Sequence, residues 1–480
     1  MKKTSTSILN DTTAKSIVDN FIAKSEDTKI KRYSNFYKYN DFAFNGNQWS
    51  DDDLPDDNTP ALSFNQAQDF LDVYLAKLFP RDPVSGVLSV GVKIIENDKN
   101  LRDKYEKQIL NAYYKNKFAQ ILLEQGQNFF YGGDACLYYP RIPNTNEVKI
   151  ISLDPSKVYL GWSGSQLEQF AFEDEISISD VSSKDVKNNW IIIAINYFLG
   201  KNTSEINKFE KVKRITYWDN KYQIVKVGDN VKTYKNNDGF IPFSWIPNSP
   251  RAHSHEGISE VKRLFYLEKE YNERASNFSD RVKTNTDAIV ALMTDKKVSD
   301  LTRDDIKKLL KLGQGDDAKI LSLPENREIL EYLEILSKKM SAKMSLNDAV
   351  MGNIKSNVSS LAMIYYFSPL LDKISLKRVQ WDQGIRDLNS AILFYAFGKK
   401  GYNTDPVYNP VIISDKETQI NNTIRLLENR LISHTDAIDE LRGVENSEEK
   451  FNQIQEEFKK LQMIDGFLNK KRIDSKREEL

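Results

Sequence analysis

The stretch Gly257–Lys283, GISEVKRLFYLEKEYNERASNFSDRVK, decides the fold. Its apolar side chains recur at steps of three and four, and only Glu268 interrupts the series, which predicts one long amphipathic helix. Ser259 is placed to cap the first turn, which is acidic at Glu260. The apolar positions are Val261, Leu264, Tyr271, Ala275, Phe278 and Val282. A helix of about 27 residues is about 40 Å long, and its densely charged flanks favour packing side by side with neighbouring helices.

A small insert and a second long helix follow. Segments 288–292 and 319–323 read as strands, with a short helix at 304–312 between them. Pro324, a favoured first-turn residue, opens the second helix. Its apolar face carries Ile329, Leu333, Leu336, Met340 and Met344. The sequence therefore predicts a compact α/β insert held between two long helices.

The next segment, 347–358, contains Asn, Gly and Ser that interrupt the helical pattern, so a loop is expected. A third long helix is predicted over about Ser359–Phe397, with Pro369 in its interior. Proline removes a backbone hydrogen bond there, so we expect a kink. The kink either sets the direction in which this helix leaves the loop or is an ordinary bend in a packed helix.

The flanking regions mix helices and strands. Up to about residue 90 the pattern indicates short helices and loops, and 97–129 reads as a single amphipathic helix. Residues 135–245 turn to strands, one of them at 190–198, and the prolines of 240–247 favour an edge strand or an extended crossing. A strand is expected at Pro410–Ile413, followed by at least three helices. One of these begins with a capping-box-like Ser433-His434-Thr435-Asp436 and stops at Gly443, and a basic segment of poor pattern ends the chain.

Bulk composition limits the function. The 480 residues suffice for two or three domains, and Lys+Arg total 68 against Asp+Glu 69, a formal charge of −1. That balance argues against a protein that coats DNA by neutralising phosphates, but it is compatible with one that DNA slides past. The single cysteine, Cys136, excludes an intrachain disulfide and favours a reducing compartment. No apolar run reaches the roughly 18 residues of a membrane span.

No catalytic constellation stands out. His253 and His255 with Glu256 would make a minimal metal site, but no further ligand completes it, so a loop without metal is favoured. The acidic loop 51–58 is either a solvated turn or a cation site. Cys136 lies in an apolar run that indicates a buried thiol, and the chain contains neither a P-loop nor a G-x-S-x-G elbow. We therefore expect no catalytic residue, no cofactor and no metal.

The order of short motifs is similar to that of a known family. Phe44–Trp49 reads FNGNQW and Pro60–Asn65 reads PALSFN. Further matches are Gly133-Asp134-Ala135 before a strand, Leu153–Val158 after it, and Ile241-Pro242 followed by Gly257–Val261. Each motif alone is weak. The ordered set, joined to helix, insert, helix, loop and proline-containing helix, resembles the phage portal proteins, also called head–tail connectors.

The resemblance implies an α+β, mainly helical portal fold, assembled as a ring around a central channel. Its expected parts are a wing at 1–256, stem helices at 257–283 and 324–346, a clip at 284–323, a tunnel loop at 347–358, a long kinked helix with the wing return at 359–425, and a crown with the C-terminal tail at 426–480. Portals of this kind form twelve-subunit rings at one vertex of the virion capsid, and we expect assembly in the host cytoplasm. The implied partners are double-stranded DNA in the channel, the major capsid protein, the terminase large subunit, tail adaptor proteins and a scaffold, with no membrane.

The resemblance also implies where DNA is contacted. The tunnel-loop candidates are Asn347, Asn353, Lys355, Ser356 and Asn357. Lys355 is the only cation of that loop, so repeated around a ring it would form a positive band, unless it is merely a solvated loop charge. Lys338, Lys339 and Lys343 are the next candidates, and Pro369 is the helix kink. The alternatives are another virion structural protein, such as an adaptor or scaffold, and an enzyme acting on nucleic acid.

Overall fold

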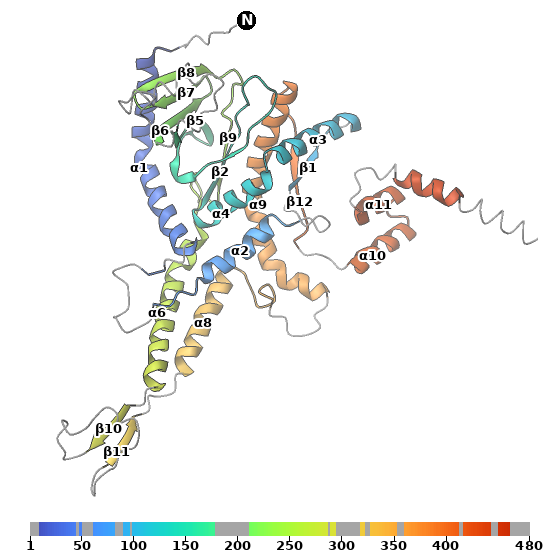
Figure 1. Cartoon of the computed structure of the whole chain (residues 1–480). Helices are drawn as coiled ribbons and strands as arrows, with labels where there is room; N and C mark the ends of the chain where they lie inside the picture. The colour runs from blue at the N-terminus through green and yellow to red at the C-terminus, as the bar shows by residue number, and fades with distance from the viewer. Residues whose placement is uncertain are drawn as a thin grey trace, which may run out of the picture. The chain divides into compact units, whose positions relative to one another are not determined.

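The computed structural model in Figure 1 describes residues 9–44, 48–49, 61–81, 90–96, 98–177, 211–286, 289–293, 317–321, 327–352, 360–411, 416–442 and 450–460. The chain divides into two compact units. The larger comprises Met1–Asn353 and Tyr366–Asn409, and the smaller comprises Ile354–Tyr365 and Pro410–Leu480. Helices and strands both occur throughout the larger unit, which confirms the predicted α+β class.

A five-stranded antiparallel sheet forms one part of the larger unit, in the order β4-β5-β6-β7-β8. Its strands are β4 (Val158–Ser163), β5 (Gln166–Ser177), β6 (Lys211–Asp219), β7 (Tyr222–Val227) and β8 (Asn230–Lys235). Helix α1 (Asp11–Phe44) lies across one face of this sheet (Figure 1). Ala14, Val18 and Phe21 of α1 pack on Tyr159 and Tyr217, so apolar burial joins helix and sheet.

The other face of this sheet packs against a three-stranded sheet of order β3-β2-β9. These strands are β2 (Asp134–Tyr138), β3 (Ile151–Ser152) and β9 (Phe243–Pro247), and the 3-10 turn η2 (Pro155–Lys157) precedes β4. Cys136 is fully buried between the two sheets, which confirms its interpretation as a buried thiol. β9 is an edge strand, as its prolines predicted, because proline cannot donate to a neighbouring strand.

A helical core forms the centre of the larger unit. It contains α2 (Gln66–Leu78), α3 (Lys99–Lys115), α4 (Phe118–Tyr131) and, from Tyr366 onward, α9 (Ser360–Phe397). Trp381 of α9 is fully buried, with its ring 4.8 Å from that of Phe79 and 5.7 Å from that of Phe129. Strand β1 (Val90–Ile94) pairs antiparallel with β12 (Thr404–Tyr408). As predicted, α9 is one helix that continues through Pro369.

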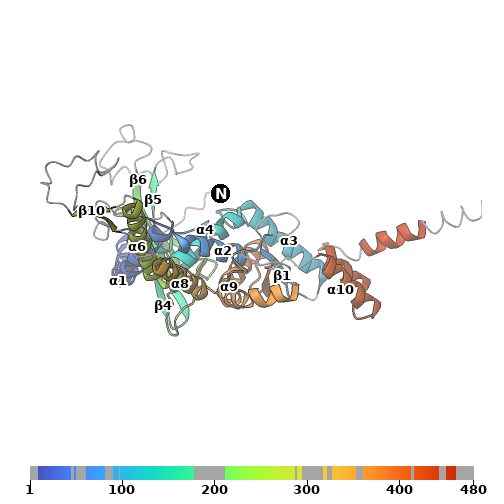
Figure 2. The same ribbon diagram turned by 90° about the horizontal axis from the view of Figure 1, so that it is seen from below.

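The two predicted long helices are present as α6 (Glu260–Thr286) and α8 (Arg327–Lys343). They lie side by side in both views (Figures 1 and 2). Between them in sequence, β10 (Ile289–Met293) and β11 (Asp317–Leu321) form an antiparallel pair, which confirms the two predicted strands of the insert. The hairpin and the two helices therefore follow the order that the sequence indicated.

The smaller unit contains α10 (Lys416–Glu428), α11 (His434–Arg442) and a helix over 450–460. The capping box at the start of α11 is confirmed in both directions. The Asp436 amide donates to Ser433 Oγ at 3.1 Å, and the Ser433 amide donates to Asp436 Oδ2 at 3.1 Å. Two backbone donors of the first turn are thereby satisfied.

Three expectations for the flanking regions were wrong. The first is the mixture of short helices, because α1 alone covers 34 residues. Its ends pack against different partners, the sheet at Val18 and α6 at Phe42, so no single face shows a helical period. Another is the strand expected at Pro410–Ile413: Pro410 and Val411 are not in a strand, residues 412–413 lie outside the described part of the chain, and the strand of this region is β12, which ends at Tyr408.

The single helix expected over 97–129 was also wrong, because this segment is divided into α3 and α4. Lys117 adopts a left-handed conformation with φ of 51°. The Asn116 side chain stabilises the break: its Nδ2 donates to the carbonyls of Ala112 and Val148, and its Oδ1 accepts from the amide of Ile150. A side chain that binds a distant segment thus ends the helix, which a local pattern cannot indicate.

Some predictions lie outside the described residues. They concern the acidic loop 51–58, the strand at 190–198, the short helix at 304–312, the loop residues 353–358, the helix stop at Gly443 and the basic end of the chain.

Candidate functional site

Helices α6 and α8 form an antiparallel pair. The Tyr332 hydroxyl donates to Glu270 Oε1 at 3.4 Å, and Lys343 Nζ donates to the Arg263 carbonyl at 3.3 Å. The predicted apolar faces are buried at Val261, Leu264, Ala275, Leu333, Leu336, Met340 and Met344, whereas Val282 is exposed. The N-terminal half of α6 and the C-terminal half of α8 therefore form most of the buried contact between the two helices.

Glu268, which interrupts the apolar series of α6, is completely buried and has a structural role. Its carboxylate accepts from Gln48 Nε2 at 3.0 Å and from the Ala67 amide at 2.9 Å. Burial raises the pKa of Glu268, and these hydrogen bonds only partly offset that effect. Gln48 also donates to Asn65 Oδ1 at 3.0 Å. Two residues of the quoted N-terminal motifs, Gln48 and Asn65, therefore fix the segment before α2 to α6.

A buried ionic cluster joins the first turn of α6 to α9. Lys377 Nζ donates to Glu260 Oε1 at 2.5 Å and to Asn248 Oδ1 at 2.7 Å, and both charged side chains are at most 5% exposed. Arg263 adds a second cation 3.4 Å from Glu260 Oε2. Burial acts to raise the pKa of Glu260, but Lys377, Arg263 and the hydrogen bonds outweigh it, so the pKa lies below its ordinary value. We name Asn248, Glu260 and Lys377 the junction cluster.

Close backbone packing surrounds the junction cluster. The Asn248 amide donates to the Gly133 carbonyl at 2.8 Å, and Asn248 Nδ2 donates to the Ile258 carbonyl at 2.8 Å. A Cβ atom on Gly257 would lie 1.8 Å from the Gly133 carbonyl oxygen, so only glycine fits. Ser259 Oγ donates to the Tyr131 carbonyl and accepts from the Lys262 amide, which confirms the predicted cap. The glycines of two quoted motifs, Gly133 and Gly257, meet here.

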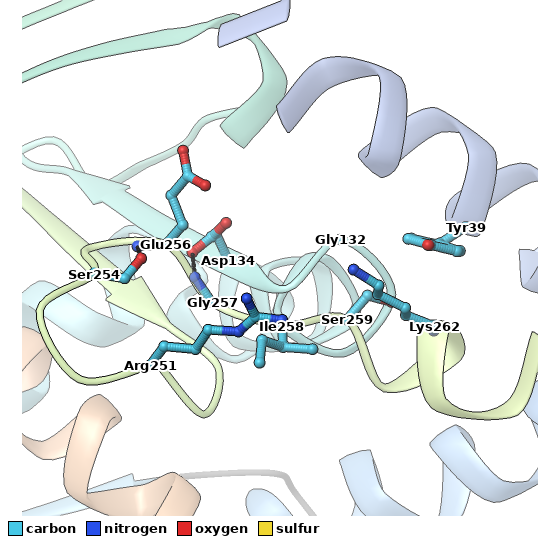
Figure 3. A pocket seen from close by; sticks show the side chains of 10 residues that line it. All are labelled: Tyr39, Gly132, Asp134, Arg251, Ser254, Glu256, Gly257, Ile258, Ser259 and Lys262. Carbon is cyan, nitrogen blue, oxygen red and sulfur yellow. Dashed lines mark hydrogen bonds between the residues drawn. The ribbon is translucent and has the colours of Figure 1, made fainter. Parts of the chain in front are cut away.

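A small polar pocket of about 170 Å³ opens beside this packing (Figure 3). Its wall includes Arg251 and Lys262 opposite Asp134 and Glu256, and Asp134 Oδ1 accepts from the Gly257 amide at 2.8 Å. His255 stacks on Trp162 with 4.1 Å between ring centroids. Among the described residues, no group of three His, Cys, Asp or Glu side chains is arranged to hold a metal ion.

The three predicted stem lysines lie in the C-terminal half of α8, and their side chains are exposed. Lys338 pairs with Glu334 at 2.5 Å, and Lys343 contacts the Arg263 carbonyl. The N-terminal half of α8 is acidic, with Glu328, Glu331 and Glu334 exposed. Positive charge on α8 is therefore concentrated at the end that adjoins the predicted tunnel loop.

Asn347 is the one tunnel-loop candidate that falls within the described residues, since Asn353, Lys355, Ser356 and Asn357 lie outside them. Its Nδ2 donates to the Tyr366 carbonyl at 2.6 Å, and its Oδ1 accepts from the Val350 amide at 3.0 Å. Tyr366 is three residues before Pro369, in the turn where proline disturbs the backbone hydrogen bonds. Asn347 thus supports α9 near its proline, while the kink itself stays a prediction.

The comparison with protein families decides which class of protein this is. The family model described as "Phage portal protein, SPP1 Gp6-like" matches residues 19–462, nearly the whole chain. The chain belongs to the phage portal protein family. No curated protein sequence matches it. The resemblance inferred from the motifs is therefore confirmed.

Family membership places this portal protein among the structural, oligomeric components of the phage capsid, at a vertex of the virion. Of the helices that the structure describes, none is both long enough and apolar enough to span a bilayer. The sequence analysis missed the junction cluster and the role of Gln48. Gln48 and Asn65 stood in recognisable motifs, but Lys377 lies in an ordinary helical stretch that gives no signal.

Proposed function

We propose that this portal protein forms a closed ring, with twelve subunits in the virion, that is the conduit for genome packaging and ejection. The match to the portal family over residues 19–462 carries this proposal. In this role the ring has no enzymatic turnover. It nucleates assembly with the major capsid protein and scaffold in the host cytoplasm, binds the terminase large subunit, and later binds tail adaptor proteins.

Exposed apolar side chains on the helices of the larger unit support a ring. Tyr266 of α6 is 76% exposed and Leu376 of α9 is 72% exposed, and Tyr332 and Ile335 of α8 are also exposed. Large apolar side chains on one helix face are typical of interaction surfaces. Contacts between copies would remove them from water and so stabilise the ring.

The charge distribution supports passage of DNA. A net charge of −1 leaves no general attraction for phosphates, so a channel made of such subunits does not trap DNA. We propose that Lys338, Lys339 and Lys343, together with Lys355, contact the DNA backbone transiently. These contacts are independent of sequence because they reach phosphates and not base edges.

The part assignments from the sequence analysis remain proposals. The proposed parts are a wing at 1–256, stem helices at 257–283 and 324–346, a clip at 284–323, a tunnel loop at 347–358, a kinked helix at 359–425 and a crown at 426–480. The order α6, β10, β11, α8 and α9 along the described residues supports this assignment. We assign the docking of terminase and adaptors to the clip.

Negative-stain electron microscopy of the purified protein tests the proposed function. We expect closed rings with a central hole, and no hydrolysis of ATP or DNA in the same preparation. A stable monomer that hydrolyses ATP or cleaves DNA would disprove the portal role.

A further inference from the structure

A groove on one flank of the larger unit is left open in the single chain. It lies between α2, α8, the turn after α8 and the proline region of α9, and its volume is about 660 Å³. Its lining on α8 consists of three small side chains, Ser337, Ser341 and Ala342, and of Lys338, whereas Phe70, Met351 and Pro369 supply apolar contacts. Small side chains allow a partner to approach the helix closely, so this groove can receive a bulky side chain.

A bulky side chain of the same chain is exposed on α6. Tyr266 of α6 is 76% exposed, and its ring meets Phe265, which itself packs on Phe42 of α1. In both views α8 lies between α6 and α9, with α1 beside α6 (Figures 1 and 2). The helix that carries Tyr266 and the α9 wall of the groove therefore lie on opposite sides of α8.

The tyrosine and the groove lie at the same height along the stem. Glu270 contacts Tyr332 at one level, and Arg263 contacts Lys343 at another. Because the helices are antiparallel, Tyr266 lies between these two levels, opposite the turn of α8 that contains Ser337 and Ser341. Rotation about an axis parallel to the stem preserves height, so Tyr266 of one copy would meet the groove of the next.

The charges of the two surfaces are complementary. Three of the four helical neighbours of Tyr266 are basic, namely Lys262, Arg263 and Lys269. Arg263 lies 3.4 Å from Glu260, and the fourth neighbour, Glu270, pairs with Arg274 at 2.8 Å, so the balance of charge around Tyr266 is positive. The groove lining carries the acids Asp69 and Asp348, and its one lysine, Lys338, is paired with Glu334. Complementary charge of this kind fixes the register of an interface.

We propose that Tyr266 of one copy inserts into this groove on the adjacent copy, so that every subunit gives one tyrosine and receives one. The contact is heterologous, because a patch on one flank meets a different patch on the other, and it closes when the rotation completes a ring. Tyrosines in such pockets often dominate binding. The inference rests on the proposed ring and adds the contact that builds it.

Site-specific crosslinking tests the contact directly. The double variant Tyr266→Cys/Ser341→Cys is treated with a short bis-maleimide reagent and separated under denaturing conditions. The native Cys136 is fully buried and serves as background in all samples. We expect a ladder of covalent oligomers. The matched control Tyr114→Cys/Ser341→Cys, with a tyrosine of α3 that is 87% exposed, should remain monomeric.

A second measurement uses assembly itself. Tyr266→Ala should raise the protein concentration needed for half-maximal assembly of the oligomer about tenfold or more. Tyr266→Phe keeps the aromatic side chain and should assemble nearly as well as the unmodified protein. Circular dichroism checks that the alanine variant is folded. Rings in micrographs without a crosslinked ladder would overturn this contact and leave the proposed function intact. If the unmodified protein forms no ring, the contact and the proposed function both fail.

Discussion

At the scale of the residue, the junction cluster shows how charge is tolerated inside the protein. Glu260 and Lys377 are both almost fully buried, and each has the other as a hydrogen-bond partner. An unpaired buried charge is far more costly than a buried pair, so the two side chains depend on each other. Asn248 bonds to both, accepting from Lys377 Nζ through Oδ1 and donating to Glu260 Oε1 through Nδ2. The first turn of α6 is thereby held to α9.

Replacement of Lys377 by methionine should destabilise the protein strongly. The change leaves Glu260 as a buried carboxylate without its main partner, and we expect a loss of about 3–5 kcal/mol in the free energy of unfolding. Denaturant unfolding measures the loss. The exposed Lys338→Met is the control and should change stability little, since the ion pair of Lys338 with Glu334 lies on the surface. Equal stability of the two variants would contradict the role given to the junction cluster.

The junction cluster also predicts how stability depends on pH. The pKa of Glu260 lies below its ordinary value of 4.5. Its contribution to stability is therefore full above pH 4.5 and is lost as the pH falls through the lowered value. The double variant Glu260→Gln/Lys377→Met should show a shallower loss of melting temperature on acidification. Parallel pH curves for the variant and the unmodified protein would contradict this.

A substitution of Lys355 tests whether the predicted tunnel loop contributes to DNA packaging. We expect Lys355→Ala to form normal rings but to change packaging or retention of DNA, because a positive band in the tunnel loop would be lost. The measurement is the amount of DNA protected from nuclease in assembled particles. Unchanged packaging would show that Lys355 is only a solvated loop charge.

At the scale of the element, the exposed lysines of α8 should set the salt dependence of DNA binding. Replacing Lys338, Lys339 and Lys343 by alanine should weaken binding equally for duplexes of different sequence. The slope of log affinity against log salt should decrease by about one for each phosphate contact that is lost. Fluorescence anisotropy at several salt concentrations measures the slope. The matched control replaces Lys104, Lys107 and Lys115, three exposed lysines of α3, and should leave it unchanged.

The bounds of a helix could be predicted where the helix packs against the same neighbours along its whole length. They could not be predicted where its neighbours change or where a distant segment ends it. Helices α6 and α8 each keep a buried face along their length, so their apolar period is visible in the sequence. Helix α1 changes partner along its length, and the end of α3 is determined by Asn116, which binds Val148 and Ile150. The sequence near these sites contains no local signal of the distant segment.

The candidate site divides in the same way. Lys338, Lys339 and Lys343 lie within a strongly patterned helix and Pro369 within a long one, so the sequence could place these residues on helices, while their contact with DNA stays a prediction. The junction cluster could not, since it joins β9, α6 and α9, and sequence separation hides such a contact. The small groove beside α8 likewise depends on α2 and α9 being placed next to it.

At the scale of the whole molecule, a single chain buries its sheets and helical core but leaves apolar side chains exposed on α6, α8 and α9. A near-neutral subunit with such surfaces is suited to self-association more than to coating DNA. Membership of the portal family agrees with this property. The ring, and not the subunit, is therefore the unit that would conduct DNA.

A cryo-electron microscopy reconstruction of the purified full-length protein tests the central claim most directly. The predicted result is a closed ring in which α6 and α8 of every subunit surround a central channel, with the C-terminal half of α8 directed toward that channel. A ring with α6 and α8 on its outer surface, or a particle without a channel, would contradict it.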